Sequence, residues 1–345
     1  MGSESDSQSL LRWYIDTRPL TASTTTLPLL DTLQPSDQET VKKYYHLKDK
    51  HMSLASYLLK YLFIHRTCRI PWDKITISRT PPPHHRPCFI PSLALTTDNP
   101  KGLPTIEFNV SHQASLIALA GTTTPASSPD PTTKSTASTT PNPSTTPTPS
   151  TPQVGIDITC VNERRSTDNT QQTRPALEEF VDIFCEVFSQ RELQTIKNAA
   201  APTPGRPESD AVAYAFRLFY TYWALKEAYI KMTGEALLAP WLRELEFLDV
   251  VAPDPPAACG GGASSLECGV PYTGVRTLLY GQRVADVRIE VVALGEDYLI
   301  ATAARGGRVG SSSGSVNPDV WLGLKPVDIE VDVGPCARGL CRCLG

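Results

Sequence analysis

One acidic residue interrupts an otherwise apolar stretch of the chain. In GIDIT, Gly155 to Thr159, the carboxylate of Asp157 lies between Ile156 and Ile158. Burying an unpaired carboxylate is costly, so Asp157 needs a cation, which is an arginine, a lysine or a metal ion. From this pattern alone, a structural ion pair and a functional site are equally good explanations.

A second group of charges lies in YWALKEAYIK, Tyr222 to Lys231. At about 100° per residue, Trp223 shares a narrow helical face with other apolar side chains. Glu227 and Lys231 border that face, and Lys226 lies on the opposite flank. An ordinary amphipathic helix turns this border toward solvent, where Glu227 and Lys231 form a surface pair worth a few tenths of a kcal/mol. Other parts of the chain must show whether these charges form such a surface pair or belong to a functional site.

Polar residues also end an expected strand in FNVSHQ, Phe108 to Gln113. At such a position Ser111 and His112 are more often turn formers than ligands. Carboxylates such as Asp157 and Glu227 are the oxygen ligands that Mg²⁺ prefers, and lysines beside them suit phosphate groups. Taken together, these stretches indicate a polyphosphate substrate rather than a sugar or a peptide.

The elements that would position these residues repeat along the chain. The first half should contain a helix over 53–66, a short strand at Ile75 and Ile77, and strands over 106–110 and 115–121 around a turn at 111–114. The second should contain a buried strand over 154–161, helices over 176–199 and around Trp223, a segment over 242–250 and a hairpin over 287–305 around Gly295. This order predicts an α+β fold of two similar halves, with the site in the cleft between them.

A low-complexity tract separates the two halves. Between Thr122 and Pro152, all but five residues are Ser, Thr or Pro. Such a tract cannot bury enough apolar surface to offset its ordering entropy, so we predict a disordered insertion. The expected division is an N-terminal half over 1–121, the insertion over 122–152, a C-terminal half over 153–305 with a Gly/Pro-rich loop at about 251–275, and a C-terminal tail over 306–345.

The composition excludes several classes of protein. The 345 residues carry a net charge of −4, which does not indicate a protein that binds nucleic acid. The polar start predicts no secretory signal, and no apolar run is long enough to span a membrane. Nine cysteines, an odd number scattered over the chain, predict reduced thiols and a cytoplasmic location. Cys336, Cys341 and Cys343 cluster in CARGLCRCLG, but no partner pair at zinc-site spacing is visible, so this segment is interpreted as a solvent-exposed tail.

Four motifs together resemble a known family. HHRPCF, FNVSHQ, GIDIT and WALKEAYIK occur in the order and spacing of Sfp-type 4′-phosphopantetheinyl transferases, the long pseudo-dimeric members that modify carrier proteins. The last motif matches the family pattern W-x-x-K-E-x-x-x-K at Trp223, Lys226, Glu227 and Lys231. The resemblance covers about residues 12–305 and is greatest to filamentous-fungal members. It implies two halves related by a pseudo-two-fold axis.

The resemblance also implies a reaction. Members of the family transfer the 4′-phosphopantetheine arm of coenzyme A to a serine of an acyl or peptidyl carrier protein and release adenosine 3′,5′-bisphosphate. Asp157 and Glu227 would then ligate Mg²⁺, and Glu227 or a water it orients would accept the serine proton. Lys231 would bind the pyrophosphate, with Lys226 beside it. The nucleotide phosphate would be held by Ser111, His112, Arg86 and Lys48.

The chain departs from the family pattern at two positions. Many bacterial members carry Glu two residues after the aspartate, where this chain has Thr159, so one metal ligand is missing. Gln113 follows the Ser-His pair as in animal members, in which that amide approaches the metal. A basic residue often found before the first long helix aligns here with Met52, which weakens the expected phosphate anchoring in that region.

Two rival classes remain beside the transferase. A non-catalytic homologue that binds coenzyme A or a carrier protein would keep the fold without turnover, and a scaffold would use the Ser/Thr/Pro tract to recruit partners. The resemblance implies apo carrier domains of polyketide synthases, nonribosomal peptide synthetases and α-aminoadipate reductase as partners, with fatty-acid synthase as a further candidate. It implies no membrane or nucleic-acid partner, and two fused halves predict a monomer.

Overall fold

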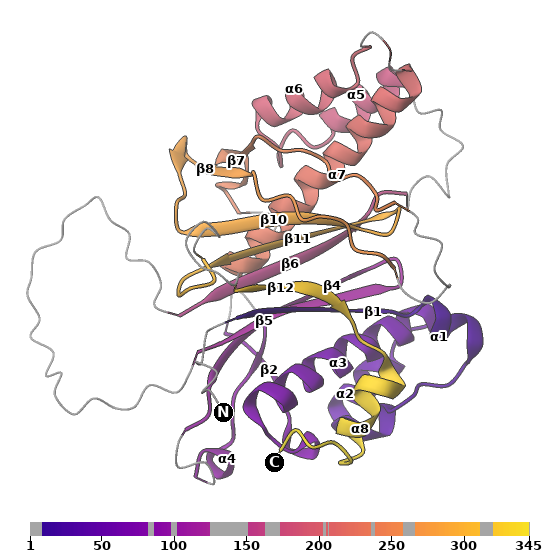
Figure 1. Ribbon diagram of the computed structural model, residues 1–345, viewed down its shortest axis with the longest axis vertical. Coiled ribbons are helices and arrows are strands. Elements are labelled where there is room, and N and C mark those ends of the chain that lie inside the picture. Colours follow the sequence, from indigo (N-terminus) through magenta and orange to yellow (C-terminus); the bar gives the residue numbers. More distant parts are fainter. Residues whose placement is uncertain are drawn as a thin grey trace, which may run out of the picture.

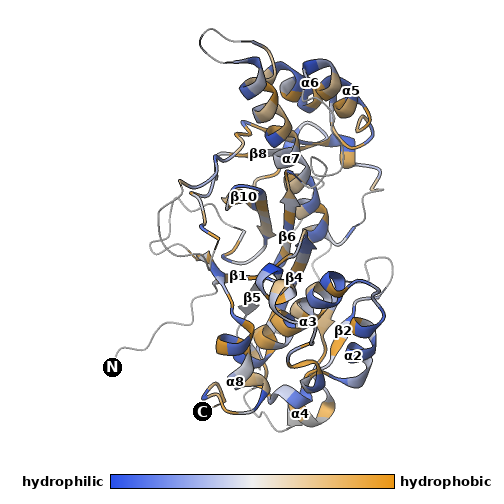
Figure 2. Cartoon of the chain, turned by 90° about the vertical axis from the view of Figure 1, so that its right-hand side faces the viewer, coloured by the Kyte–Doolittle hydropathy of each residue, from blue (hydrophilic) through white to orange (hydrophobic). Residues whose placement is uncertain are grey.

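The computed structural model describes residues 9–81, 86–97, 102–124, 151–162, 173–202, 205, 207–235, 239–257, 266–310 and 320–344. Two groups of helices lie at opposite ends of the molecule, and the main β-sheets lie between them (Figure 1). The side view in Figure 2 shows the same arrangement. Mixed helix and sheet content confirms the predicted α+β class. Among the described residues, no helix is both long and apolar enough to cross a membrane.

The first group of elements surrounds a long buried helix. A four-stranded sheet has the order β12–β1–β5–β4, in which β1 pairs with β5 antiparallel and with β12 parallel. Its strands are β1 (Leu10–Asp16), β4 (Thr105–Gln113), β5 (Leu116–Thr124) and β12 (Trp321–Pro326). The helices beside it are α1 (Arg18–Ser23), α2 (Pro35–Lys42), α3 (Leu47–Cys68) and α8 (Gly334–Ala337). Short elements complete this part: β2 (Ile77–Arg79), β3 (Pro87–Phe89) and α4 (Leu93–Thr97).

The second group repeats the plan of one long helix on antiparallel strands. A three-stranded sheet has the order β10–β11–β6, and a smaller sheet has the order β7–β8–β9. The strands are β6 (Gln153–Cys160), β7 (Leu245–Leu248), β8 (Arg276–Leu279), β9 (Gln282–Arg283), β10 (Val287–Leu294) and β11 (Tyr298–Arg305). The helices are α5 (Arg174–Asp182), α6 (Gln190–Ala199) and α7 (Glu208–Thr233).

Three apolar cores hold the molecule together. One core packs α5, α6 and α7 on the second sheet, and another packs α2 and α3 on the first sheet. The third lies between the two sheets, where Leu10, Tyr14 and Ala118 meet Ile156 and Ile300. Buried apolar surface stabilises a contact by about 25 cal/mol per Å². This third core therefore joins the two parts through a shared hydrophobic interface rather than a loose hinge.

Several predicted elements begin or end at other residues in the structure, and one predicted core residue lies elsewhere. The turn expected over 111–114 is shorter, since β4 runs to Gln113 and only Ala114 and Ser115 connect it to β5. Both connecting residues have positive φ, as a tight two-residue hairpin requires. The expected helix over 176–199 is two helices, because Ser189 forms a capping box that starts α6. The half-buried Trp223 packs on Phe184 at the edge of its core rather than inside it.

The Ser/Thr/Pro tract and the expected tail also need revision. Residues 122–124 belong to β5, and the disorder predicted for 125–150 lies outside the described residues. The interpretation of CARGLCRCLG as a solvent-exposed tail was wrong for its cysteines, because Cys336 is buried and Cys341 and Cys343 are half-buried. Residues 338–340 of the same segment are exposed. β12 completes the first sheet, and the following π-helix, Ile329–Val333, packs into the core around α3. Apolar burial outweighs the ordering cost of this segment, as the 1% exposure of Cys336 shows.

Candidate active site

Two edge strands, β4 and β6, meet at the boundary between the two sheets. Their backbones do not pair; instead, side chains on alternate β4 residues accept hydrogen bonds from backbone N–H groups of β6. These bonds join Ile156 N to Asn109 Oδ1 (3.3 Å), Ile158 N to Ser111 Oγ (3.2 Å) and Cys160 N to Gln113 Oε1 (2.9 Å). They satisfy the free edge of β6 and fix its register relative to β4.

A glycine brings helix α7 against the same strand. A Cβ atom at Gly155 would lie 2.0 Å from the Ala228 carbonyl oxygen and 2.4 Å from the Met232 backbone nitrogen. Neither backbone atom can move without displacing α7, so a side chain at position 155 would push the helix away from β6. This close approach places Asp157 opposite the face of α7 that carries Glu227 and Lys231.

Asp157 is the centre of a hydrogen-bonded group drawn from three elements. Its Oδ1 accepts from Lys231 Nζ at 2.7 Å and from Ser111 Oγ–H at 3.1 Å, and Lys231 Nζ also lies 2.9 Å from Ser111 Oγ. Its Oδ2 accepts from Thr159 Oγ1 at 2.9 Å. The Asp157 side chain is 7% exposed and that of Lys231 is 28% exposed. The group therefore presents its lysine to solvent and its carboxylate to the interior.

Glu227 lies beside this group on α7, one turn before Lys231. Burial, and after it the negative charge of Asp157, together raise the pKa of Glu227 to about 7 against the opposing effect of Lys231. Two carboxylates thus share one lysine. Glu227 accepts a proton more readily than an ordinary carboxyl, or it needs a further cation to remain ionised.

Lys226 does not join this group, which corrects the expectation that it lies by the phosphates. Its side chain is fully buried and binds Glu192 Oε2 at 2.9 Å. The ammonium also donates to the carbonyl oxygens of Leu242, at 3.0 Å, and Leu245. Because successive residues of a helix point about 100° apart, Lys226 faces α6 and β7 while Glu227 faces β6.

Arg86 and Gln113 reach the same junction but are engaged with the protein. Arg86 forms an ion pair with Glu107 and donates to the carbonyl oxygens of Val154 (2.9 Å) and Met232 (3.3 Å). It therefore ties β4, β6 and α7 together beside Gly155. The Gln113 oxygen accepts the Cys160 N–H, so a metal ion would have to use its second lone pair. The roles of both residues toward a ligand stay predictions.

A cavity of about 260 Å³ opens beside His112, between β4 and the N-terminal half of α3. It is lined by His112, Val110, Asp49, Met52, Ser53, Ser56, Tyr57, Lys60, Arg79, Thr40, Tyr44 and Pro87. Desolvation lowers the pKa of His112, and the positive charges of Lys231 and Lys60 lower it further. Lys48 is exposed in the first turn of α3, next to Asp49. The cavity lies near the Asp157 group, since the charges of Lys231 and Asp157 both act on the pKa of His112.

The sequence reasoning missed two cations of this cavity, Lys60 and Arg79. Lys60 is 7% exposed, and burial lowers its pKa to about 8. Its ammonium lies 3.9 Å from the centre of the Tyr57 ring. The signal was present in SLASYLLKYLFIHR, where a lysine interrupts the apolar run of the expected helix. A buried lysine that lines a cavity favours an anionic ligand.

The donor set fits a magnesium ion. At this junction Asp157 lies on β6 and Glu227 on α7, and the pKa of Glu227 is raised first by burial and then by the negative charge of Asp157, against the opposing charge of Lys231. A divalent cation would relieve that repulsion, and two carboxylates with waters and phosphate oxygens match the ligands that Mg²⁺ prefers. Thr159 donates to Asp157 and supplies no carboxylate.

A polar group of this kind, at the junction of two sheets and beside a cationic cavity, suits a transferase of phosphate-containing groups. Comparison with known proteins agrees. Two family models match, "4′-phosphopantetheinyl transferase, N-terminal" over residues 21–124 and "4′-phosphopantetheinyl transferase superfamily" over residues 153–271. The chain belongs to the 4′-phosphopantetheinyl transferase family.

Fungal and animal relatives show how far the similarity extends. The chain is 60% identical to 4′-phosphopantetheinyl transferase A of Aspergillus fumigatus, over 97% of this chain and 96% of that protein. It is 56% identical to 4′-phosphopantetheinyl transferase NpgA of Emericella nidulans, over 99% and 98%. It is 26% identical to the L-aminoadipate-semialdehyde dehydrogenase-phosphopantetheinyl transferase of Rattus norvegicus, over 79% and 67%. The predicted fungal resemblance is confirmed.

Proposed function

We propose that the chain transfers 4′-phosphopantetheine from coenzyme A to a carrier-protein serine. The serine oxygen attacks the phosphorus that bears the pantetheine arm and forms a new O–P bond. The bond from that phosphorus to the oxygen bridging the two phosphates breaks, and adenosine 3′,5′-bisphosphate leaves with the bond's electron pair. The serine proton passes to a base. The observation that carries this proposal is the Asp157–Ser111–Lys231 group with Glu227 beside it.

The chain's own residues divide the work. Glu227, with its raised pKa, accepts the serine proton directly or through a water it orients. Lys231 is the exposed cation of the group and neutralises charge on the leaving bisphosphate. Ser111 and Thr159 hold the Asp157 carboxylate in one orientation. When bound by Asp157 and Glu227, Mg²⁺ would supply charge neutralisation at the pyrophosphate.

The nucleotide end of coenzyme A belongs in the cavity beside His112. Lys60, Arg79 and His112 supply cationic or hydrogen-bonding groups there, and Lys48 lies exposed near its rim. Arg86 supports this region by bonding β4, β6 and α7. One ligand would place its nucleotide in this cavity and its pyrophosphate at the Asp157 group, because Lys231 and Asp157 are near enough to His112 for their charges to act on its pKa.

We also propose that the halves are related by a pseudo-two-fold axis. In each half a long helix, α3 or α7, packs on an antiparallel hairpin, β4–β5 or β10–β11. The site then lies in the cleft between them, since β4 comes from one half and β6 and α7 from the other. One chain supplies every residue of this site, which supports a monomer.

The proposed partners are apo carrier domains of polyketide synthases, nonribosomal peptide synthetases, α-aminoadipate reductase and fatty-acid synthase. The name of the rat relative, L-aminoadipate-semialdehyde dehydrogenase-phosphopantetheinyl transferase, supports α-aminoadipate reductase as one of the carriers. The eight cysteines that the structure describes are all free thiols, which supports a reducing, cytoplasmic location.

The test uses the full chain, coenzyme A and apo carrier domains of each class. We expect a mass increase of the carrier equal to one phosphopantetheine, dependent on Mg²⁺ and on the carrier serine. A carrier whose serine is replaced by alanine is the matched control. Coenzyme A binding without any mass increase, across all carrier classes, would favour the non-catalytic binding homologue instead.

A further inference from the structure

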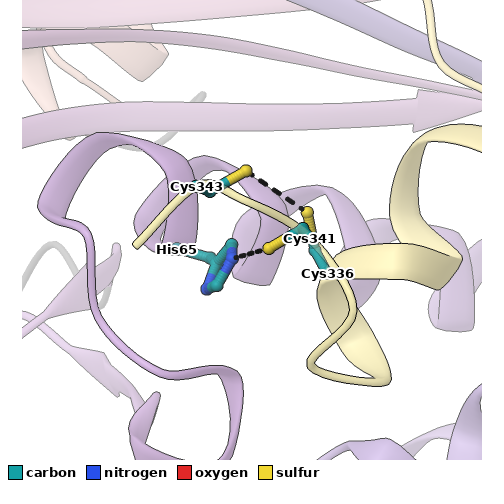
Figure 3. A group of neighbouring side chains, drawn as sticks. All are labelled: His65, Cys336, Cys341 and Cys343. Atoms are coloured by element: carbon teal, nitrogen blue, oxygen red, sulfur yellow. Dashed lines mark hydrogen bonds between the residues drawn. The ribbon is translucent and has the colours of Figure 1, made fainter. Parts of the chain in front are cut away.

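Four potential metal ligands gather far from the proposed active site, where the C-terminal segment meets the last turn of α3. They are His65 of α3, Cys336 of α8, and Cys341 and Cys343 in the chain that follows (Figure 3). Their ligand atoms all lie within 4.8 Å of one another. His65 Nε2 is 3.0 Å from Cys341 Sγ, and the Sγ atoms of Cys336 and Cys343 are 3.8 Å apart.

The distance between the Cys336 and Cys343 sulfur atoms matches a tetrahedral metal site better than a disulfide. Zinc–sulfur bonds of about 2.3 Å at tetrahedral angles place two sulfur ligands about 3.8 Å apart. A disulfide requires sulfur atoms about 2.05 Å apart. Three thiolates and one imidazole are soft and borderline ligands, the set that tetrahedral zinc prefers over magnesium or calcium.

Neighbouring residues orient the ligands as they would around a bound ion. His65 Nδ1 lies 2.7 Å from the carbonyl oxygen of Ile70 and donates to it, which leaves the Nε2 lone pair facing the sulfur atoms. Arg69, with φ of 52°, ends α3 in the left-handed conformation and turns that carbonyl back toward the helix. Arg66 donates to the Asp332 carbonyl at 2.9 Å and to the Cys336 thiol. Such outer partners fix the tautomer of a metal-binding histidine and stabilise its thiolates.

The fold, rather than local sequence spacing, brings the four ligands together. β12 pairs with β1, and the segment that follows buries Val327, Ile329 and Val333 against α3. This packing carries three cysteines to a histidine that lies 276 residues from Cys341. The proposed transfer reaction uses none of the four, so their convergence needs another explanation.

We propose that His65, Cys336, Cys341 and Cys343 bind one Zn²⁺ ion. All four ligands come from the protein, which leaves no open position for a substrate and makes the site structural rather than catalytic. Binding releases three thiol protons to solvent and joins the segment after β12 to the C-terminal end of α3. The N-terminal half of the same helix lines the cavity beside His112, so the ion fixes one end of a helix whose other end faces the proposed ligand.

Zinc content of the purified full chain tests this proposal directly. We expect about one zinc per chain by elemental mass spectrometry, and Co²⁺ substitution should give the absorption bands of a tetrahedral thiolate site. Cys341→Ser and Cys343→Ser, at half-buried positions, should each weaken zinc binding by more than about tenfold, since loss of even an outer partner of a metal ligand costs about 10–100-fold. Cys185→Ser is the matched control, because Cys185 is also a half-buried free thiol but lies outside the cluster.

Thermal unfolding gives a second readout, and its first measurement is made on the wild-type chain. A zinc-selective chelator, added with Mg²⁺ in excess, should lower the melting temperature of the wild-type chain and of Cys185→Ser. The chelator should leave the melting temperature of Cys341→Ser unchanged. Carrier modification is measured separately, so failure of the proposed transfer would leave the zinc result standing.

Two outcomes would overturn the zinc site. One is wild-type protein without zinc that also shows two fewer free thiols after denaturation, since the cysteines would then form a disulfide. The other is equal zinc content and equal chelator sensitivity in Cys341→Ser, Cys343→Ser and Cys185→Ser, which would mean that the zinc is bound elsewhere.

Discussion

The two lysines of α7 each bind a carboxylate, Lys231 at 2.7 Å from Asp157 and Lys226 at 2.9 Å from Glu192. The Lys226 pair is fully buried, and backbone groups satisfy what remains: two carbonyl oxygens bind the ammonium, and the Phe247 and Ser189 N–H groups bind the carboxylate. The Lys231 pair is partly exposed and has a second carboxylate, Glu227, beside it. The ion-pair distance therefore does not distinguish Lys226 from Lys231. What distinguishes them is the partial exposure of the Lys231 pair and the second carboxylate, Glu227, beside it.

The largest expected effect is on catalysis, from Glu227→Gln. The change keeps the shape but removes the charge that a metal ion and a proton both need. We expect the rate of carrier modification to fall by roughly 10²–10⁴-fold, the usual cost of losing a general base, with weaker Mg²⁺ binding in addition. Mass spectrometry of the carrier over a Mg²⁺ titration measures both the rate and its dependence on Mg²⁺. Wild-type turnover by this variant would remove Glu227 from the site.

A comparable effect on stability is expected from Lys226→Met. Removing one partner of a fully buried pair leaves Glu192 uncompensated and should lower the free energy of unfolding by about 3–5 kcal/mol. The double variant Lys226→Met with Glu192→Met should recover much of that loss, because neither charge then remains buried alone. Chemical denaturation of the single and double variants measures both. A single variant as stable as wild type would contradict the assignment of this pair as structural.

A smaller effect on rate is expected from Lys231→Ala. The variant loses the cation facing the proposed pyrophosphate, which should slow transfer by roughly 10²-fold. Raised coenzyme A should recover part of the rate, since ground-state contacts are lost as well. Its melting temperature should change far less than that of Lys226→Met, because Asp157 keeps its bonds from Ser111 and Thr159. Steady-state kinetics at varied coenzyme A, beside melting curves, separates the two lysines.

The smallest effect concerns pH. The pKa of Glu227 is about 7 in the folded chain, above the ordinary value of 4.5, so the folded state binds its proton more tightly than the unfolded state. This contribution to the free energy of unfolding is present in full below about pH 4.5 and is lost as the pH rises through 7. Without metal, Glu227→Gln should remove that decline and unfold at a higher temperature than wild type at pH 8.

The same titration should appear in turnover. At low Mg²⁺, the rate should rise with pH around 7, as Glu227 loses its proton, and the midpoint should move to lower pH as Mg²⁺ is raised. A pH profile that does not respond to Mg²⁺ would separate the metal from Glu227.

The local pattern of apolar and polar residues predicted the helices and strands of this chain well, and the spacing of charged residues on the helix around Trp223 located part of the candidate site. Periodicity found α3 and the β10–β11 hairpin, and the grouping of Asp157, Glu227 and Lys231 followed from the family motif. The motif alone could not tell that Lys226 points away, although its position about 100° from Glu227 on the helical wheel already separated them. Motif membership reports that a residue is needed, not whether it is needed for chemistry or for packing.

Features that depend on distant partners could not be predicted. The acceptors on β4 that satisfy the edge of β6 lie 47 residues away in sequence, across the Ser/Thr/Pro tract. The partner of the C-terminal cysteines is a histidine in the first half, so a search for nearby pairs found none. Lys60 could not be assigned to a cavity from the sequence, because that cavity is lined by segments from α2 to β4.

The parallel pairing of β12 with β1 has a consequence for biosynthesis. Residues 321–326 leave the ribosome long after β1, so this edge of β1 stays unpaired while the residues between them are made. Domains usually fold as they emerge, from the N-terminus onward, but this sheet cannot be completed in that order. An open strand edge can pair wrongly with other chains. Yield in cells should therefore depend on how quickly β12, once made, pairs with β1.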